Sequence, residues 1–413
     1  MSLASPNTAQ PTFPPLREDP LAPPQVYARI RAGAGLEKIT LWNGKEMWLV
    51  PGYHDARTVL ADSRFSADST RPDFPVVRPS AVAFQTPPGK YRQAFFRMDA
   101  PEHTRLRKML TRDFIVRKAD ALRPSLLAHA NELVDTFTAD GRTDAELVAQ
   151  LALPMPLKLI CDMLGVPDGD RELFGERANA YINSAMNSGA TAESGQAAQA
   201  QLMLYIDDLV TRRRAEGGGD DILGRLIADY LVSGELTHED AVTTAMLLLI
   251  AGHETTANQI ATSVAALIRF RDQWDLLVER PELIVSATEE LLRYLSVVHI
   301  TTMRVATEDV RVGNTLIRAG EAVLALLSAA NRDDRHFERA DELDITRHRR
   351  DHIAFGFGQH QCLGQPLARA EIHVALSVLT QRLPQLRLAV PFDDLQFRVQ
   401  AAVHGVDALP VRW

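Results

Sequence analysis

The stretch that decides the fold is Phe355–Gly364, FGFGQHQCLG, near the C-terminal end of a 413-residue chain. Its glycines, among them Gly358 and Gly364, permit tight turns and leave room for a flat ring system beside Cys362. A cysteine thiolate can bind haem iron from such a loop if backbone N–H groups point at its sulfur. A helix expected over about Leu363 to Leu383 would aim its positive end at this sulfur and lower its pKa. This segment, here called the cysteine loop, therefore predicts haem-thiolate chemistry with Cys362 as the ligand to iron.

The other cysteine, Cys161, lies in the apolar helical segment LKLICDML and is expected to be a small buried core residue. Two cysteines cannot form a disulfide framework, and this usage is typical of a reducing compartment. The N-terminal segment lacks both the basic start and the apolar core of a signal peptide, and no membrane anchor is expected there. We therefore expect a cytoplasmic protein.

The pattern F-x-x-G-x-H-x-C-x-G resembles the cysteine loop of the cytochrome P450 family, and the resemblance extends over nearly the whole chain from about residue 25. Glu290-Leu-Leu-Arg293 adds to it, because in that family an E-x-x-R ion pair on a helix stabilises the core around the loop. Arg347 is expected to join this pair. The resemblance implies the P450 fold, mainly α with a small β subdomain, as a single domain over residues 23–413. Residues 1–22, rich in proline, are expected to be a disordered lead-in.

The resemblance also implies the cofactor haem b, iron protoporphyrin IX, whose two carboxylates need cations if they are buried. His103 and Arg107 stand four apart and share one helical face, as in an H-x-x-x-R helix of the family. Arg304 matches an arginine on the strand after E-x-x-R, and His360 matches the histidine two before the cysteine. The residues expected to contact the haem are His103, Arg107, Ala251, Arg304, Phe355, Gly358, His360, Cys362 and Gly364.

A long helix is expected from Thr237, which begins a T-x-x-D pattern like a capping box, to about Phe270. Its middle, Ala251-Gly252-His253-Glu254-Thr255, resembles the oxygen-activating A-G-x-(D/E)-T segment of the family. By this resemblance Gly252 leaves space for O2, and Thr255 and Glu254 are the catalytic residues, the first donating a hydrogen bond and the second relaying protons. The zinc motif H-E-x-x-H does not fit, because its second histidine is replaced by alanine.

The resulting hypothesis is a monooxygenase that inserts one atom of O2 into a small apolar organic substrate, by hydroxylation or epoxidation. The chain has no flavin or nicotinamide fingerprint and no cysteine-rich iron–sulfur run, so electrons must come from separate partners. The resemblance implies a ferredoxin and a ferredoxin reductase. The alternatives are a haem-thiolate nitric oxide reductase, a peroxygenase, a non-catalytic haem-binding protein or an unrelated helical enzyme. The Glu254-Thr255 pair argues against the first three.

The charge pattern gives expectations about partners. With 45 basic and 53 acidic residues the net charge is −8, and no long basic run predicts a nucleic-acid partner. Neither is a membrane partner expected, and the chain is expected to be a monomer. Arg105, Lys108 and Arg112 are spaced by three and four, and they predict a basic stripe where an acidic ferredoxin docks.

Loops are expected over Arg71–Gly89, which is rich in proline, and Asn187–Gln196, which is rich in Ser, Gly and Ala. Asn43-Gly44 predicts a hairpin between the apolar runs Ile39–Trp42 and Met47–Val50. By resemblance, the substrate pocket is lined by Arg78 to Phe95, the region of Asn187, Leu248, Ala251, Val297 to Thr302 and Ala401 to Val403.

Overall fold

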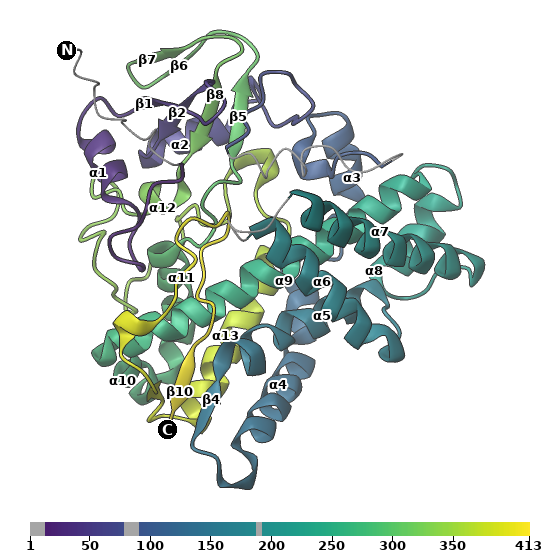
Figure 1. Ribbon diagram of the computed structural model, residues 1–413, viewed down its shortest axis with the longest axis vertical. Coiled ribbons are helices and arrows are strands. Elements are labelled where there is room, and N and C mark those ends of the chain that lie inside the picture. The colour runs from purple at the N-terminus through teal and green to yellow at the C-terminus, as the bar shows by residue number, and fades with distance from the viewer. Residues whose placement is uncertain (1–12, 78–90, 187–191) are drawn as a thin grey trace, which may run out of the picture.

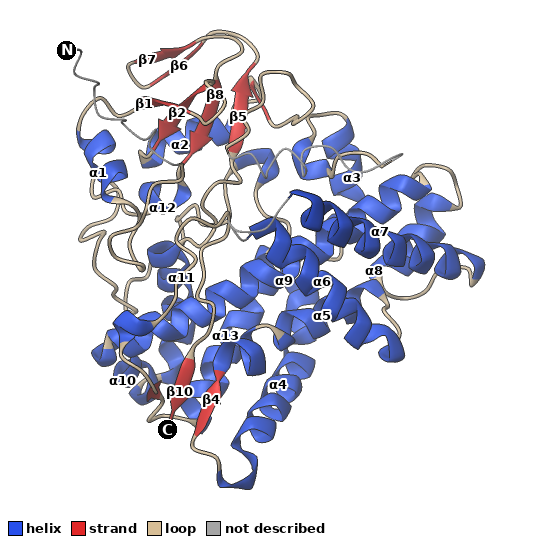
Figure 2. Ribbon diagram, in the orientation of Figure 1, coloured by secondary structure: helices blue, strands red, loops and turns tan. Residues whose placement is uncertain are grey.

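The computed structural model describes residues 13–77, 91–186 and 192–413. Helices make up most of it, and small sheets lie toward its edges (Figure 1, Figure 2). The helices are α1 (Gln25–Ala32), α2 (Tyr53–Ala61), α3 (Glu102–Thr111), α4 (Val116–Thr138), α5 (Pro154–Leu164), α6 (Arg171–Met186), α7 (Ala192–Ala215), α8 (Ile222–Leu226), α9 (His238–Arg269), α10 (Arg271–Glu279), α11 (Ile284–Leu295), α12 (Leu327–Ala330) and α13 (Gln365–Arg382). The strands are β1 (Glu37–Thr40), β2 (Glu46–Val50), β3 (Phe65–Ser66), β4 (Asp144–Glu146), β5 (Met303–Ala306), β6 (Val310–Val312), β7 (Thr315–Ile317), β8 (Ala322–Ala325), β9 (Arg387–Leu388) and β10 (Pro410–Arg412).

The long helix α9 runs through the middle of the helical part, as Figure 1 shows, and it packs against α5, α7 and α13. The side chain of Thr237 accepts a hydrogen bond from the backbone N–H of Asp240 at 3.0 Å, so the predicted cap is confirmed. Most residues of α9 are buried on every face, which is typical of a core helix. Within the described ranges, none of the helices combines the length and the apolar character needed to cross a bilayer.

A five-stranded sheet with the order β1-β2-β8-β5-β3 lies at one end of the molecule (Figure 2). The predicted hairpin is confirmed, because β1 and β2 pair antiparallel with Thr40 opposite Glu46, and Gly44 has a φ of +78°. Strand β8 pairs parallel with β2 and antiparallel with β5. The sheet thereby joins the N-terminal hairpin to the strand that carries Arg304.

Two predictions about irregular segments need correction. The expected disordered lead-in is wrong for residues 13–22, since Leu21 is buried and its carbonyl accepts a hydrogen bond from Arg332 Nη2 at 3.1 Å. Residues 1–12 lie outside the described residues. The loop expected over Asn187–Gln196 is helical from Ala192 onward, where Ala, Glu and Gln favour a helix. Residues 71–77 of the other expected loop do lack helix and strand, whereas 78–90 and 187–191 are not described.

Candidate active site

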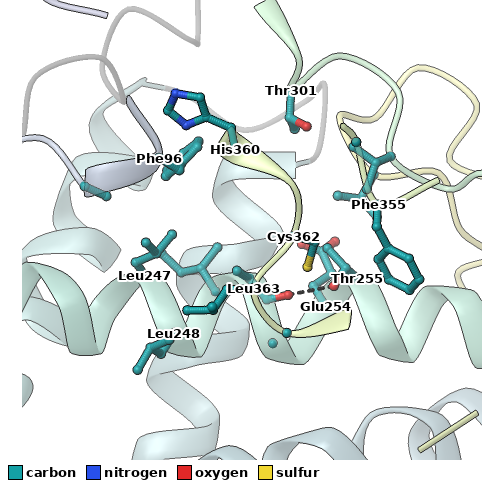
Figure 3. A pocket seen from close by; sticks show the side chains of 18 of the residues that line it. Phe96, Leu247, Leu248, Glu254, Thr255, Thr301, Phe355, His360, Cys362 and Leu363 are labelled. Atoms are coloured by element: carbon teal, nitrogen blue, oxygen red, sulfur yellow. Dashed lines mark hydrogen bonds between the residues drawn. The ribbon is translucent and has the colours of Figure 1, made fainter. Parts of the chain in front are cut away.

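A cavity of about 570 Å³ lies between the middle of α9, the cysteine loop and the segment that leads into β5. Figure 3 shows Cys362, Phe355, Glu254 and Thr255 around it. Its walls are mainly apolar, and Leu248 and Ala251 line it as the resemblance implies. The other predicted lining residues that contribute are Gln93, Ala94, Phe95, Val297, Val298, Ile300, Thr301, Thr302, Ala402 and Val403. The predicted stretch from Arg78 to Lys90, and Asn187, lie outside the described residues.

The cysteine loop presents its sulfur to this cavity. The Cys362 backbone N–H donates to the Phe355 carbonyl at 2.8 Å, which closes the loop just before α13 begins. Burial raises the pKa of the Cys362 thiol, and the N–H groups of Gly364 and Gln365, together with Arg107, act in the opposite direction. The predicted lowering of this pKa is therefore wrong without a bound cation, because desolvation outweighs the helix N-terminus. A metal ion at the sulfur would supply the missing positive charge.

Two buried ion-pair networks stabilise the structure around the cysteine loop. Arg293 donates to both carboxylate oxygens of Glu290 at 2.8 Å, and Arg347 Nε lies 3.1 Å from Glu290 Oε2, so the predicted contact of Arg347 is confirmed. Further donors of Arg293 reach the carbonyls of Asn331 and Ala340. Because the hydrogen-bond donors of Arg293 are satisfied in this way, the buried Glu290–Arg293 pair is stable, whereas an isolated buried charge would be unfavourable.

The second network was not predicted and joins α11, α13 and the start of the cysteine loop. Arg369 donates to both oxygens of Glu289, at 2.6 and 3.0 Å, and His352 Nε2 lies 3.1 Å from Glu289 Oε2. The guanidinium of Arg369 also lies over the ring of Phe355, 4.6 Å from its centroid. His352 is thus part of the structure that positions Phe355. The Glu289 pKa falls to about 2 because hydrogen bonds from His352 and Arg369 outweigh the desolvation that raises it.

Three arginines line the cavity and have no carboxylate partner among the described residues. Arg304 Nη1 donates to the Met303 carbonyl at 2.8 Å and Arg107 Nη2 to the Gln361 carbonyl at 2.7 Å, but among the described residues neither guanidinium forms an ion pair. Arg97 was not predicted and lies in the same wall. Desolvation lowers the pKa of both Arg97 and Arg304 to about 10. Buried cations without counter-ions are unfavourable, so this wall is suited to an anionic group.

His360 lies in the same wall, and the ring of His103 packs against it, with ring centroids 4.0 Å apart. Their ring nitrogens are buried and have no hydrogen-bond partner in the described part of the chain. Burial lowers the pKa of His103 to about 4 and that of His360 to about 2, so both rings are neutral at pH 7. Two carboxylates at this edge, with a flat ring above the sulfur, would satisfy the histidines and the arginines together. The residues present therefore fit a haem.

The opposite wall is the middle of α9. Ala251 and Thr255 line the cavity, and the Thr255 hydroxyl donates to the Ala251 carbonyl at 2.6 Å. A side chain at Gly252 would place its Cβ 3.2 Å from Ile160 Cδ1, so this glycine also allows α5 and α9 to pack closely. The arrangement leaves an open space beside Thr255, opposite the cysteine loop.

Glu254 is buried on the same turn of α9 and lines the cavity. Its Oε1 lies 3.1 Å from Arg398 Nη1, whereas its Oε2 is buried without a partner. Burial raises the pKa of this carboxyl to about 7, and Arg398 opposes the rise. Glu254 can therefore take up and release a proton near neutral pH. The contact with Arg398 was not predicted, because Arg398 belongs to a C-terminal segment without any motif.

The predicted basic stripe on α3 is only partly correct. Arg105 pairs with Glu102 and Asp240, and Arg112 forms a close ion pair with Asp229. Lys108 is exposed. Carboxylates on the neighbouring elements thus neutralise two of the three charges, which spacing along one helix could not indicate.

Comparisons with known proteins agree with this geometry. The family description cytochrome P450 matches residues 271–386. The chain is 47% identical to cytochrome P450-SU2 of Streptomyces griseolus, over 91% of this chain and 90% of that protein. It is 42% identical to the vitamin D3 dihydroxylase of the same organism, over 98% of both chains. The crystal structure of GfsF matches with a TM-score of 0.89 and 37% identity, covering 98% of this chain and 100% of that one.

Proposed function

Because this chain belongs to the cytochrome P450 family and is a haem-iron monooxygenase, we propose that Cys362 ligates the iron and that the adjoining cavity binds an extended apolar substrate. The enzyme inserts one atom of O2 into an apolar organic molecule and takes electrons from redox partners. The observation that carries the proposal is a single apolar cavity with a cysteine sulfur on one side and Glu254 and Thr255 on the other.

The cofactor contacts follow from the polar wall of the cavity. We propose haem b, with its carboxylates against Arg304, Arg107, His103 and His360, because Arg304 and His103 are buried, Arg107 and His360 are half-buried, and none of the four has an anionic partner among the described residues. Phe355, Gly364 and Ala251 line the cavity, whereas Gly358 does not and instead lies against the end of α2. Arg97, which shares the wall with Arg304, is added to this set.

When bound, the haem iron supplies the activation of O2 and the transfer of one oxygen atom to carbon. The remaining chemistry belongs to α9. With a pKa of about 7, Glu254 can take up and release a proton near neutral pH, and its Oε2 has no partner among the described residues. The Thr255 hydroxyl donates its hydrogen to the Ala251 carbonyl. The lone pairs of the Thr255 oxygen can therefore accept a hydrogen bond from a donor in the cavity. The apolar walls exclude bulk water from the reacting carbon.

Several finer points belong to the same proposal. The electron donors are a ferredoxin and its reductase, consistent with the absence of flavin and iron–sulfur motifs in the sequence. Residues 23–413 act as one domain, since one of three apolar core clusters takes residues from both ends of the chain, from Leu21 to Val411. We also propose that the chain acts as a monomer. Two unpaired cysteines favour a cytoplasmic location.

The test begins with ligand binding. Vitamin D3 is the first probe, because a relative of 42% identity is named for its dihydroxylation, and a linear fatty acid and a macrolide complete the series. We expect at least one of them to shift the haem from low to high spin. Turnover of that ligand under ¹⁸O2 should then place one labelled atom in each product molecule. Oxygen drawn from water instead, or no spin shift by any member of the series, would refute the proposal.

Thr255→Ala tests the role of the hydroxyl separately. We expect electron consumption to continue while product per electron falls about 10-fold or more and peroxide rises, because the hydroxyl would accept a hydrogen bond from the group that brings the proton, and a positioned proton transfer contributes about 10²–10⁴ in rate. Thr255→Ser keeps the hydroxyl and should retain most of the coupling. Equal coupling in the alanine variant and the wild type would assign proton delivery to another group.

A further inference from the structure

The C-terminal hairpin, residues 396–407, carries a charged side chain to the middle of α9. Its two arms pair through Phe397 and Val406, and the Arg398 N–H donates to the Gly405 carbonyl at 2.8 Å. The same hairpin contributes Ala402 and Val403 to the cavity wall. One short segment therefore touches both the substrate space and the acid of α9.

Arg398 lies between a buried carboxylate and an exposed one. Its Nη1 is 3.1 Å from Glu254 Oε1 and its Nε is 3.2 Å from Asp407 Oδ1, and Nη2 donates to Asn258 Oδ1. The side chain of Glu254 is 3% exposed and that of Asp407 is 59% exposed. The guanidinium thus connects the acid of the cavity to the protein surface through two ion pairs.

The fit of this arginine is tight. A side chain at Gly405 would collide with Asn258 and with the guanidinium of Arg398, so the hairpin lies close against α9 only because residue 405 is glycine. Asn258 Nδ2 also approaches Glu254 Oε1, at 3.5 Å. Among the described residues, the polar contacts of Glu254 therefore fall on Oε1, and Oε2 is buried without a partner.

We propose that Arg398 is a positioning residue for proton delivery: it fixes Glu254 at the cavity wall through Oε1, leaves Oε2 without a partner among the described residues, and shares its charge with Asp407 at the surface. This inference rests on the proposed function of Glu254. An arginine does not give up its proton, so its action is electrostatic and geometric and the proton itself comes from water. The transfer balances as a proton taken from solvent by the Glu254 carboxylate, released into the cavity, and then replaced.

The pKa of Glu254 depends on the charged groups that face its carboxylate. In the described part of the chain, Arg398 is the charged group that faces Glu254, and Asp407 faces Arg398 from the same hairpin. His253, the neighbouring residue on α9, points to the Leu153 carbonyl, and burial keeps it neutral by lowering its pKa to about 4. Loss of the Arg398 charge should therefore affect Glu254 directly.

The experiment follows the carboxyl stretch of Glu254 by infrared spectroscopy in the haem-loaded protein, with Glu254→Gln identifying the band. An opposite charge at this distance lowers a carboxyl pKa by about 1 to 3 pH units, so Arg398→Gln should raise the titration midpoint by that amount. Arg398→Lys keeps a cation and should restore most of it. Asp407→Asn removes the competing carboxylate and should lower the midpoint. Arg412→Gln, an exposed arginine on β10, is the matched control and should change nothing.

The carbon monoxide spectrum is the control for correct folding, and in every variant it must match that of the wild type. A midpoint in Arg398→Gln equal to that of the wild type would overturn the inference, and Arg398→Lys then serves as the second test of the same contact. The proposed role of Glu254 fails separately, if Glu254→Gln keeps wild-type product per electron while Arg398→Gln still shifts the band.

Discussion

At the scale of single residues, the two cysteines show that the surroundings of a sulfur atom determine its chemistry. Burial raises the pKa of Cys161 to about 11, and this thiol lies in the apolar core beside α9. Burial also raises the pKa of Cys362, but here two N–H groups and two arginines favour the thiolate. The donors around the sulfur, together with its exposure to the cavity, distinguish a ligand from a core residue.

Replacement of each cysteine tests this distinction. Cys362→Ala should abolish the red-shifted Soret band of the reduced carbon monoxide complex, because no other thiolate reaches the cavity in the described residues. Cys161→Ala is the control and should keep the band, with a loss of stability of about 1 kcal/mol from the missing sulfur. A band that persists in Cys362→Ala and disappears in Cys161→Ala would reverse the assignment.

At the scale of elements, the cysteine loop is held against the end of α2 by one glycine. Gly358 has a φ of +75°, and a Cβ there would lie 2.5 Å from the Leu60 carbonyl oxygen and 2.9 Å from Ala61 Cα. Gly356 has a similar φ of +72°, but nothing lies within 4 Å of its Cβ position. Both positions require a left-handed backbone conformation, and they differ only in the space that is available for a Cβ atom.

This pair gives a matched comparison. Gly356→Ala should cost about 1 to 2 kcal/mol of stability from backbone strain alone and keep its haem. Gly358→Ala has the same strain and must also displace the loop from α2, so we expect it to lose at least half of its haem, measured as the carbon monoxide band per protein. Equal haem content in the two variants would show that contact with α2 does not set the position of the loop.

The elements that could be predicted from sequence have local signals. Thr237 caps α9 through Asp240, three residues away, and Gly165 ends α5 in a left-handed conformation, so a short window contains the cause. The missed contacts join distant positions. Arg398 meets Glu254 across 144 residues and His352 meets Glu289 across 63, and nothing in either segment indicates its partner. Motifs identified Cys362 and Thr255, whereas their supporting charges required the fold.

At the scale of the whole molecule, the Glu289 network connects α11, α13 and the cysteine loop, so its protonation affects more than one element. The pKa of Glu289 is about 2 in the folded protein, below its ordinary value near 4.5. A carboxyl with a lowered pKa stabilises the fold above its unfolded pKa and loses that contribution as the pH falls from about 4.5 to about 2. The contribution at neutral pH is on the order of 3 kcal/mol.

Glu289→Gln should therefore be less stable than the wild type at pH 7, by about 3 kcal/mol in urea unfolding of the haem-loaded protein. The difference should shrink as the pH is lowered below 4.5, because the wild type loses the same interaction on protonation. Glu308→Gln, an exposed residue 3.7 Å from Arg64, is the control and should change little at either pH. A difference that stays constant with pH would mean that Glu289 acts through packing and not through its charge.

The parallel pairing of β2 with β8 has a consequence for the chain while it is being made. Trp48 Nε1 donates to Glu321 Oε2 at 2.8 Å, 273 residues further along the chain, next to the pairing of Met47 with Ala322. At about 5 to 20 residues per second, a ribosome needs roughly 15 to 55 s to synthesise that interval. During this time the β1–β2 hairpin has an open edge, and Met47 and Leu49 lack the strand that later covers them. Until β8 leaves the ribosome, the nascent N-terminal hairpin is therefore a natural binding site for chaperones.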